Sequence, residues 1–225
     1  MCGSSNQDWL AKARRRMLNR DLKGRGITNP AVLRAMAEIP REEFVSQAHK
    51  AHSYADRPLP IGMDQTISQP YIVALMTQEL RLHRDCEVLE VGTGSGYQTA
   101  ILSRLAKHVY TIEKFGQLAE SAKQVLQRLG LSNIEFCVGD GSCGWPESRL
   151  PPAGCFDRIM ITAAVPEIPP PLADQLAEGG FILAPIGAEV LQQLVVGRKV
   201  ARKLTETVVC NCRFVKLLGR YGFQK

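Results

Sequence analysis

The 225-residue sequence contains no uninterrupted apolar run that approaches the roughly 18 residues a membrane helix needs. No hydrophobic stretch follows Met1, so we expect neither a secretory signal nor a lipoprotein signal. Hydrophobic residues make up 45% of the chain and charged residues 22%, an ordinary globular composition that excludes disordered, collagen-like and coiled-coil proteins. The length suits one α/β domain that buries a full core without disulfides or a structural metal.

Metal-ligand spacing is also missing. The seven cysteines include no Cys-x-x-Cys pair, and the four histidines form no ligand pattern with the one short pair, Cys210 and Cys212. An odd number of cysteines in a chain without an export signal fits reduced thiols. We therefore expect no metal site and a cytoplasmic location.

Acidic residues are too few to balance the basic ones, and the formal net charge is +6. The excess is uneven, because residues 1–50 carry +5, residues 51–197 carry −6 and residues 198–225 carry +7. A basic protein invites a nucleic-acid function. A chain with basic ends and an acidic middle is also expected when the two ends are simply solvent-exposed tails, and charge alone favours this second interpretation.

The first fifty residues carry helical patterns, and a different kind of segment follows them. Asp8 is expected to cap a first helix whose arginine run, Arg14 to Arg16, faces mostly outward, and Asn29 precedes a proline that suits the start of a second. Residues 51–69 show neither a helical nor a strand-like periodicity of hydrophobic residues. Connections of this length inside a compact domain are usually functional or disordered. Because residues 51–69 keep several apolar side chains, we expect an ordered functional loop.

Strands and helices alternate from residue 70 onward, which predicts a doubly wound, mostly parallel α/β sheet. The β-rich tail has no long helix, so we expect antiparallel strands at one sheet edge. Strands are expected at 87–91, 109–113, 134–138, 156–162, 181–185, 190–196 and 204–217, and helices at 70–82, 97–106, up to 129 and around 172–177.

A glycine-rich run, Gly92-Thr93-Gly94-Ser95-Gly96, joins the first of these strands to a helix, as nucleotide-type ligands require. It lacks the Gly-Lys-Ser/Thr ending of a phosphate-binding P-loop. Ser95 is one position away from the centre of a serine-hydrolase elbow. Tyr97 stands where a dinucleotide fingerprint needs its last glycine. The remaining spacing, Gly-x-Gly-x-Gly, is typical of S-adenosylmethionine (AdoMet) enzymes with this topology.

The next two strand ends also carry ligand-type residues. Glu113 closes the second strand, where a carboxylate can accept hydrogen bonds from both ribose hydroxyls, although nicotinamide enzymes share this feature. Asp140, between two glycines after the third strand, can accept from an adenine amine, with Gly141 beside it. A solvated strand end and a simple turn are the competing interpretations.

The segment after the fourth strand, residues 162–166, bears on the methyl acceptor. It lacks the acid and the aromatic residue with which base-amino methyltransferases hold a flipped base. No Pro-Cys occurs that could attack a cytosine. A carboxylate acceptor fits best, because its reference pKa lies near ~4 and no base is needed to deprotonate it.

Taken together, the run Pro58-Leu59-Pro60-Ile61-Gly62-Met63-Asp64-Gln65-Thr66-Ile67-Ser68-Gln69-Pro70 and the run from Val88 to Ala100 closely resemble the protein-L-isoaspartate O-methyltransferase family. Further matches are Gly139-Asp140-Gly141, Gly144-Trp145-Pro146 and Phe156-Asp157-Arg158-Ile159, and the resemblance extends from about residue 19 to residue 219. The family commonly has glycine where Asp64 stands.

The resemblance implies a class I AdoMet-dependent methyltransferase of Rossmann-like fold. It would methylate the free α-carboxylate of L-isoaspartyl residues in damaged proteins and peptides, and the ester would close to a succinimide and allow repair. Ser68 would be the active-site residue and orient the substrate carboxylate, although Ser68 could also cap the following helix. AdoMet would contact Thr66, Ile67, Gly92, Thr93, Gly94, Ser95, Glu113, Asp140 and Gly141, and the substrate would contact Pro60, Ile61 and Ser68.

We therefore expect one methyltransferase domain over residues 1–225. Its parts are an N-terminal extension (1–18), a substrate loop (51–69), an AdoMet-binding core (86–186) and C-terminal edge strands (190–218). We expect a monomer that binds neither nucleic acid nor membrane. The alternatives are an RNA or DNA methyltransferase of the same fold, a non-catalytic AdoMet-binding module and a nicotinamide oxidoreductase.

Overall fold

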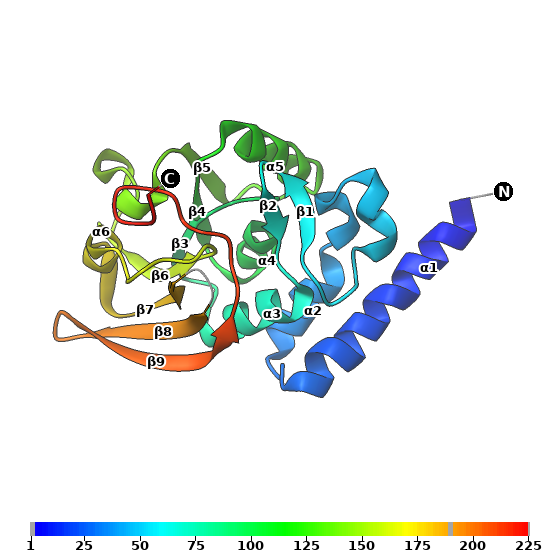
Figure 1. The fold of residues 1–225 in the computed structure, drawn as a ribbon, viewed down its shortest axis with the longest axis horizontal. Coiled ribbons are helices and arrows are strands. Elements are labelled where there is room, and N and C mark those ends of the chain that lie inside the picture. Colours follow the sequence, from blue (N-terminus) through cyan, green and yellow to red (C-terminus); the bar gives the residue numbers. More distant parts are fainter. Residues whose placement is uncertain (1–2, 189–190, 225) are drawn as a thin grey trace.

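The fold is built on one seven-stranded sheet (Figure 1), in a computed structural model that describes residues 3–188 and 191–224, with side chains described from Asp8 onward. The strand order is β5-β4-β3-β6-β7-β8-β9, in which the first five strands are parallel, β8 pairs antiparallel with β7, and β9 pairs antiparallel with β8. The strands are β3 (Glu87–Val91), β4 (His108–Glu113), β5 (Ile134–Val138), β6 (Phe156–Ile161), β7 (Leu176–Gly187), β8 (Gln192–Val200) and β9 (Lys203–Cys212). The expected doubly wound, mostly parallel sheet is confirmed.

The chain changes direction across the sheet at β3. It runs outward through β4 to β5, and then returns to place β6 on the other side of β3. Such a switch point opens a crevice at the carboxyl ends of the strands, where ligands of α/β proteins bind. The glycine-rich run follows β3 directly, so the fold delivers it to this crevice.

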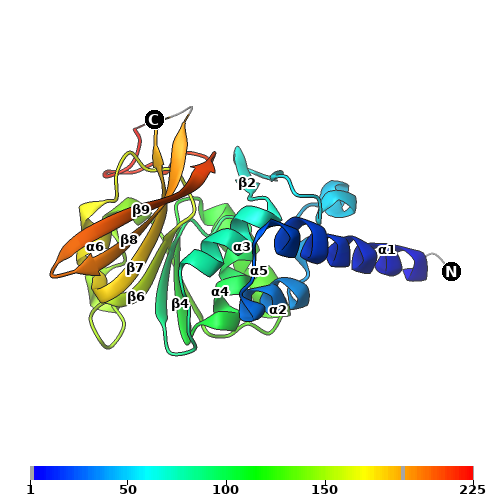
Figure 2. The ribbon, with the colours of Figure 1, turned by 90° about the horizontal axis from the view of Figure 1, so that it is seen from below.

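Helices cover both faces of the sheet (Figure 2), with α2, α3, α4 and α5 on one side and α6 on the other. Asn29 caps α2 by accepting hydrogen bonds from the Ala31 and Val32 amides, as the sequence predicts for a start at Pro30. The helices are α1 (Gly3–Arg16), α2 (Pro30–Glu38), α3 (Pro70–Glu79), α4 (Tyr97–Leu105), α5 (Gly116–Arg128) and α6 (Pro170–Asp174). None of the described helices is long and apolar enough to cross a membrane.

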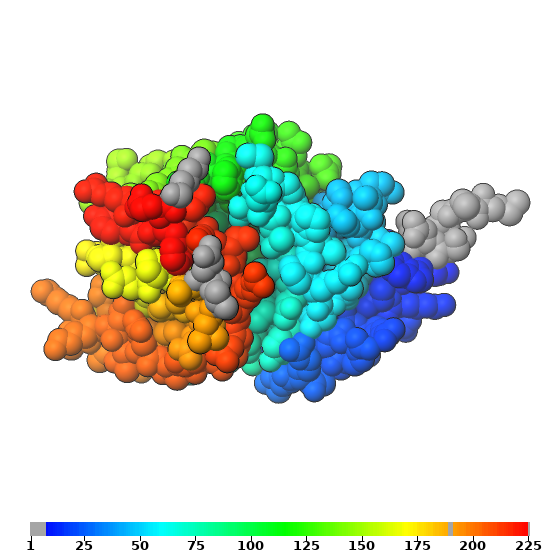
Figure 3. Space-filling model, viewed as in Figure 1, coloured from blue at the N-terminus to red at the C-terminus, as the bar shows by residue number. Residues whose placement is uncertain are grey.

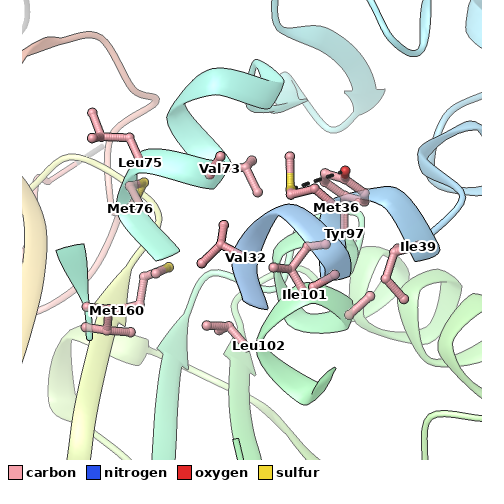
Figure 4. Packing of buried hydrophobic residues seen from close by; sticks show 14 of the residues in the cluster. Val32, Met36, Ile39, Val73, Leu75, Met76, Tyr97, Ile101, Leu102 and Met160 are labelled. Atoms are coloured by element: carbon pink, nitrogen blue, oxygen red, sulfur yellow. Dashed lines mark hydrogen bonds between the residues drawn. The ribbon is translucent and has the colours of Figure 1, made fainter. Parts of the chain in front are cut away.

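The larger part of the core lies between α2, α3 and α4 (Figure 4), where Val32, Met36 and Tyr97 are buried side by side. The Tyr97 hydroxyl reaches the Met36 sulfur at 3.6 Å. Burial of an apolar side chain such as that of Val32 or Met36 contributes about 1.5–3 kcal/mol to the free energy of unfolding. The helix that follows the glycine run is therefore anchored by packing as well as by its hydrogen bonds.

The N-terminal segment differs from expectation. Helix α1 begins at Gly3 rather than near Asp8 and continues as π-helical turns over Met17–Leu22. Met17 is fully buried in the core, so the part of the extension around it packs with the domain. Arg15 and Arg16 are exposed, as expected, whereas the Arg14 guanidinium pairs with Glu42 at 3.0 Å and donates to the Tyr54 hydroxyl.

Three other expectations need correction. The expected strand 204–217 ends at Cys212, the last residue of β9. Residues 51–69 contain a two-stranded antiparallel sheet, β1 (Leu59–Gly62) and β2 (Gln65–Ile67), rather than only a loop. The helix expected around 172–177 ends at Asp174, and β7 begins at Leu176, well before the expected 181. The first residue of the expected strand 190–196 lies outside the described residues.

Candidate active site

The hairpin β1–β2 carries the first candidate residues. Its two-residue turn, Met63 and Asp64, has positive φ values of 52° and 56°, which are those of a type I′ turn. The Asp64 side chain is exposed at this tip. The carboxylate that departs from the resembled family therefore faces solvent.

The glycine run has the backbone shape that only glycine adopts readily. Gly92 has φ +99°, and a Cβ there would lie 2.4 Å from the Thr162 Oγ1 atom. That hydroxyl donates to the Gly92 carbonyl oxygen at 2.6 Å, which ties the run to the residue after β6. Gly94 and Gly96 also have positive φ values. The run is therefore a cradle without side chains at the carboxyl end of β3.

Glu113 is buried beside this cradle at the end of β4. One carboxylate oxygen accepts the Gly94 amide at 2.8 Å, and the other accepts the Phe115 amide at 2.9 Å. Each carboxylate oxygen can accept a further hydrogen bond. Glu113 thus fixes the glycine run and keeps acceptor capacity for two hydroxyls of a ligand.

A second carboxyl, Glu90, lies fully buried in β3 below the glycine run. Its Oε2 atom accepts hydrogen bonds from the Thr99 hydroxyl at 2.6 Å and from the Thr111 hydroxyl at 2.7 Å. Thr93 lies 2.7 Å from the same Thr111 hydroxyl. Burial raises the pKa of Glu90 to about 8, so this carboxyl is mostly protonated at neutral pH. Sequence patterns alone did not single out this group.

Asp140 has a different set of partners from the one expected. Its Oδ1 atom accepts from the Ser142 amide and hydroxyl, and its Oδ2 atom accepts the Arg220 amide at 2.7 Å. Burial alone would raise the pKa of Asp140, but these hydrogen bonds outweigh it and hold the pKa below its usual range. Asp140 thus anchors the chain at Arg220, just beyond residues 214–218, a role that the sequence did not indicate.

Two neighbouring cavities of about 900 and 940 Å³, including space open to solvent, meet at Gly94 and Ser95. The first cavity brings together nine of the expected site residues: Thr66, Ile67, Ser68, Gly92, Thr93, Gly94, Ser95, Glu113 and Gly141. Pro60 and Ile61 line the second cavity, and Asp140 lines neither.

The C-terminal segment, residues 214–218, also lines the first cavity, although no sequence pattern indicates this. Lys114 donates to the Leu218 carbonyl oxygen at 2.9 Å and holds this segment in place. Figure 3 shows the C-terminal segment in red and the hairpin segment in cyan on the same face, with a recess between them. No local pattern could have placed residues so far apart in the sequence together.

Ser68 follows β2 at the edge of the first cavity. Within the described part of the chain its hydroxyl makes no hydrogen bond, and helix α3 begins after Gln69 without a side-chain cap. The capping role considered for Ser68 is therefore wrong. Its backbone carbonyl oxygen accepts a hydrogen bond from Arg41 at 2.7 Å.

Comparison with known proteins decides the family. The family model for protein-L-isoaspartate(D-aspartate) O-methyltransferase matches residues 13–222. The chain belongs to this family. It is 50% identical over 213 residues to the protein-L-isoaspartate O-methyltransferase of Trichlorobacter lovleyi, covering 94% of this chain and 96% of that protein. It is 48% identical over 211 residues to that of Methanoregula boonei, covering 94% and 95%.

Solved structures agree on the fold. A protein-L-isoaspartate O-methyltransferase structure superposes with a TM-score of 0.82 at 30% identity, covering 93% of this chain and 67% of that one. A putative family member from Plasmodium falciparum, in complex with S-adenosyl-L-homocysteine, superposes with a TM-score of 0.75 at 24% identity, covering 90% and 96%. The expected family, fold and methyltransferase class are confirmed, whereas the roles assigned to single residues stay predictions.

Among the described residues, no group of three or more histidine, cysteine, aspartate or glutamate side chains could hold a metal ion. The six described cysteines are free thiols. The candidate active site is built from backbone amides, one buried glutamate and one serine.

Proposed function

We propose that this chain transfers the methyl group of AdoMet to the free α-carboxylate of L-isoaspartyl residues in damaged proteins and peptides. The ester then cyclises to a succinimide, and hydrolysis returns part of the material to normal aspartyl. The observation that carries the proposal is the Ser68 hydroxyl, which has no intramolecular partner among the described residues and lines one cavity with the glycine run and Glu113. Family membership supports the same activity.

The first cavity fits AdoMet, which when bound supplies an electrophilic methyl group on sulfur. Glu113 would accept from the ribose hydroxyls, and the run from Gly92 to Ser95 would hold the amino acid part close to its backbone. At Gly141 a Cβ would lie 2.5 Å from the Val91 Cγ1 atom, so a residue with a side chain would not fit beside the ligand there. Thr66 and Ile67 would border the reacting methyl group.

Asp140 enters the proposal with a changed role. Both of its carboxylate oxygens already hold protein groups, Ser142 and the Arg220 amide. Asp140 would therefore act on the adenine mainly by holding the C-terminal segment, and its remaining acceptor capacity would serve the exocyclic amine.

Ser68 would orient the substrate by donating its hydroxyl proton in a hydrogen bond to the isoaspartyl carboxylate. A carboxylate is ionised at neutral pH, so no protein base has to remove a proton. Pro60 and Ile61 would hold the substrate backbone along the second cavity, which meets the first at Gly94 and Ser95. The chemistry then needs little beyond alignment and the exclusion of water.

We further propose a cytoplasmic monomer that binds neither nucleic acid nor membrane. Free thiols support a reducing compartment. The basic residues Arg14 and Lys114 have partners within the chain, which argues against a role for them as nucleic-acid contacts.

Two peptides that differ only in an isoaspartyl or a normal aspartyl linkage test the proposal. With AdoMet labelled in its methyl group, we expect base-labile label on the isoaspartyl peptide and only background on its aspartyl twin. Equal labelling of both peptides, or of neither, would contradict the assignment. Salt-dependent methylation of RNA or DNA instead would establish the alternative activity.

A further inference from the structure

Among the described acidic and basic side chains, only Arg41 and Glu90 have no exposed surface. Because the Glu90 carboxyl is mostly protonated at pH 7, Arg41 is the one of the two that carries a charge. It opens a short 3-10 helix, Arg41–Phe44, and its guanidinium lies among three separate segments. Within residues 3–188 and 191–224 no carboxylate forms an ion pair with it, and its Nη1 atom has no hydrogen-bond partner. A buried cation in this state is unusual and calls for an explanation.

The carboxylate that acts on Arg41, Asp56, lies beyond ion-pair distance and is paired with Arg25. Burying a charge without an ion-pair partner is costly for folding, by several kcal/mol for an ion of this size. Burial lowers the pKa of Arg41 to about 10, so the guanidinium remains charged at neutral pH. Chains depart from the rules of core packing mainly at sites that serve function. The contacts of Arg41 show which function this is.

Two backbone carbonyl oxygens accept hydrogen bonds from Arg41. Its Nε atom donates to Ser53 at 2.7 Å, and its Nη2 atom donates to Ser68 at 2.7 Å. These two residues bound the segment 53–68, which contains the whole hairpin β1–β2 and ends at the proposed active-site serine. One planar guanidinium therefore closes the base of the hairpin.

The same guanidinium also contacts the cofactor side of the site. It lies over the ring of Tyr97, with its central carbon 4.8 Å from the ring centroid. Tyr97 is the first residue of α4 and follows Gly96 directly. Arg41 thus connects the carbonyl of Ser68 to the residue that directly follows the glycine run.

We propose that Arg41 is a positioning residue, which sets the distance and orientation of Ser68 relative to the glycine run that would hold AdoMet. The inference rests on the proposed function of Ser68. Lysine cannot replace arginine here, because a single ammonium lacks the fixed fork that reaches two carbonyls from one plane and stacks on a ring. A displacement of about 1 Å at a reacting group can reduce the rate about 100-fold.

The test compares Arg41→Lys with Arg14→Lys. Arg14 is a matched control, because its guanidinium also lies over a tyrosine ring, that of Tyr54, and donates to the Ala37 carbonyl. Its hydrogen bonds do not involve the hairpin or Ser68. We measure the AdoMet dissociation constant, kcat and KM for an isoaspartyl peptide, and amide hydrogen exchange, in the full-length chain.

For Arg41→Lys we expect kcat to fall about 10- to 100-fold, with KM and the AdoMet dissociation constant within about threefold of wild type. Amides of residues 59–68 should exchange faster, while those of β3 and β6 keep their protection. Arg14→Lys should lose thermal stability and keep kcat. A kcat and an exchange pattern for Arg41→Lys that match those of Arg14→Lys would overturn the proposal.

Hydrogen exchange separates this inference from the proposed function. If the wild-type chain does not methylate the isoaspartyl peptide, the proposed function fails, while faster hairpin exchange in Arg41→Lys would still show that Arg41 holds the hairpin and Ser68 in place. Arg41→Gln, which removes the charge and keeps a donor, serves if Arg41→Lys does not fold. If neither variant folds while Arg14→Lys does, Arg41 serves global stability and the positioning role is overturned.

Discussion

The two walls of the first cavity are built in different ways. One wall, the glycine run with Glu113 and Gly141, sits on the carboxyl ends of neighbouring parallel strands. The other wall, the hairpin with Ser68 and the C-terminal segment 214–218, stands apart from these strand ends and is held by side-chain contacts to backbone groups. The sheet makes the first wall rigid, whereas the second depends on a few single residues.

Each wall also rests on one fully buried ionisable group, and the two groups differ in a useful way. Glu90 below the glycine run can take up a proton, because its pKa is raised to about 8. Arg41 below the hairpin keeps its charge, with a pKa of about 10. The first wall thereby avoids a buried charge at neutral pH, and the second wall retains one. We infer that the second wall gives up stability for position.

The largest expected contrast between the walls comes from adding one methyl group to each. Gly92→Ala should cost about 3–5 kcal/mol in the free energy of unfolding, because the new Cβ would meet Thr162 and the residue has φ +99°. Gly62→Ala in the hairpin has a similar φ of +94° but no atom within 4 Å of its new Cβ. It should cost about 1–2 kcal/mol. Urea unfolding measures both, and equal losses would contradict a close-packed first wall.

Glu90→Gln tests the buried carboxyl. The folded chain holds this proton up to a pKa of about 8, whereas the unfolded chain releases it near the ordinary glutamate value of 4.5. Wild-type stability should therefore fall relative to the variant as pH rises between these values, by about 1.4 kcal/mol per pH unit. Urea unfolding from pH 5 to pH 8 gives the difference. A pH-independent difference would show that Glu90 is ionised when folded.

Asp140→Ala tests the anchoring of the second wall. Loss of the hydrogen bond to the Arg220 amide should destabilise the C-terminal segment by about 1–2 kcal/mol and speed amide exchange there. AdoMet affinity should fall about tenfold, since about 1.4 kcal/mol corresponds to that factor. Ser142→Ala keeps the carboxylate and removes a hydroxyl that donates to Asp140 and accepts the Tyr221 amide at 3.0 Å, so it should have a smaller effect of the same kind.

The pKa of Asp140 gives the same anchor a pH dependence. Because that pKa is held below its usual value of 3.8, the anchor contributes its full stability above this pH and loses it as the pH falls through the lower folded value. Exchange of the segment amides, corrected for the intrinsic effect of pH, should therefore accelerate only at strongly acidic pH. An acceleration that begins near neutral pH would argue against the anchor.

The smallest effect concerns the hairpin tip. Replacing Met63 by Asn and Asp64 by Gly supplies the residues that a type I′ turn prefers, and should stabilise the hairpin by about 0.5–1 kcal/mol. The β8–β9 turn, Ala201 and Arg202, also has two positive φ values and provides a matched control outside the lining of the first cavity. Amide exchange reports both. If the same replacement at Ala201 and Arg202 slows exchange there, while the replacement at Met63 and Asp64 does not slow exchange in the hairpin, the hairpin tip is already optimal.

The same contrast explains what could be predicted from the sequence. The bounds of β3 and the glycine run follow from local pattern, since a buried parallel strand reads as an apolar run and tight turns require glycine. The bounds of β5, a half-buried edge strand, also match the expected 134–138. The hairpin, the C-terminal segment and Arg41 depend on partners far along the chain. Lys114 and Leu218, for example, are 104 residues apart. Family resemblance located Ser68 and the residues of the hairpin, but only the structure showed what holds them.

The first wall is proposed to bind AdoMet and the second to align the substrate, and Ser68→Ala tests this separation of roles most directly. Titration with AdoMet and methyl transfer to an isoaspartyl peptide are measured on the same preparation. We predict a dissociation constant within about threefold of wild type and a transfer rate reduced about 10- to 100-fold, as expected for one hydrogen bond to a charged group. A variant with the wild-type rate, or one that loses AdoMet binding and transfer together, would contradict the account.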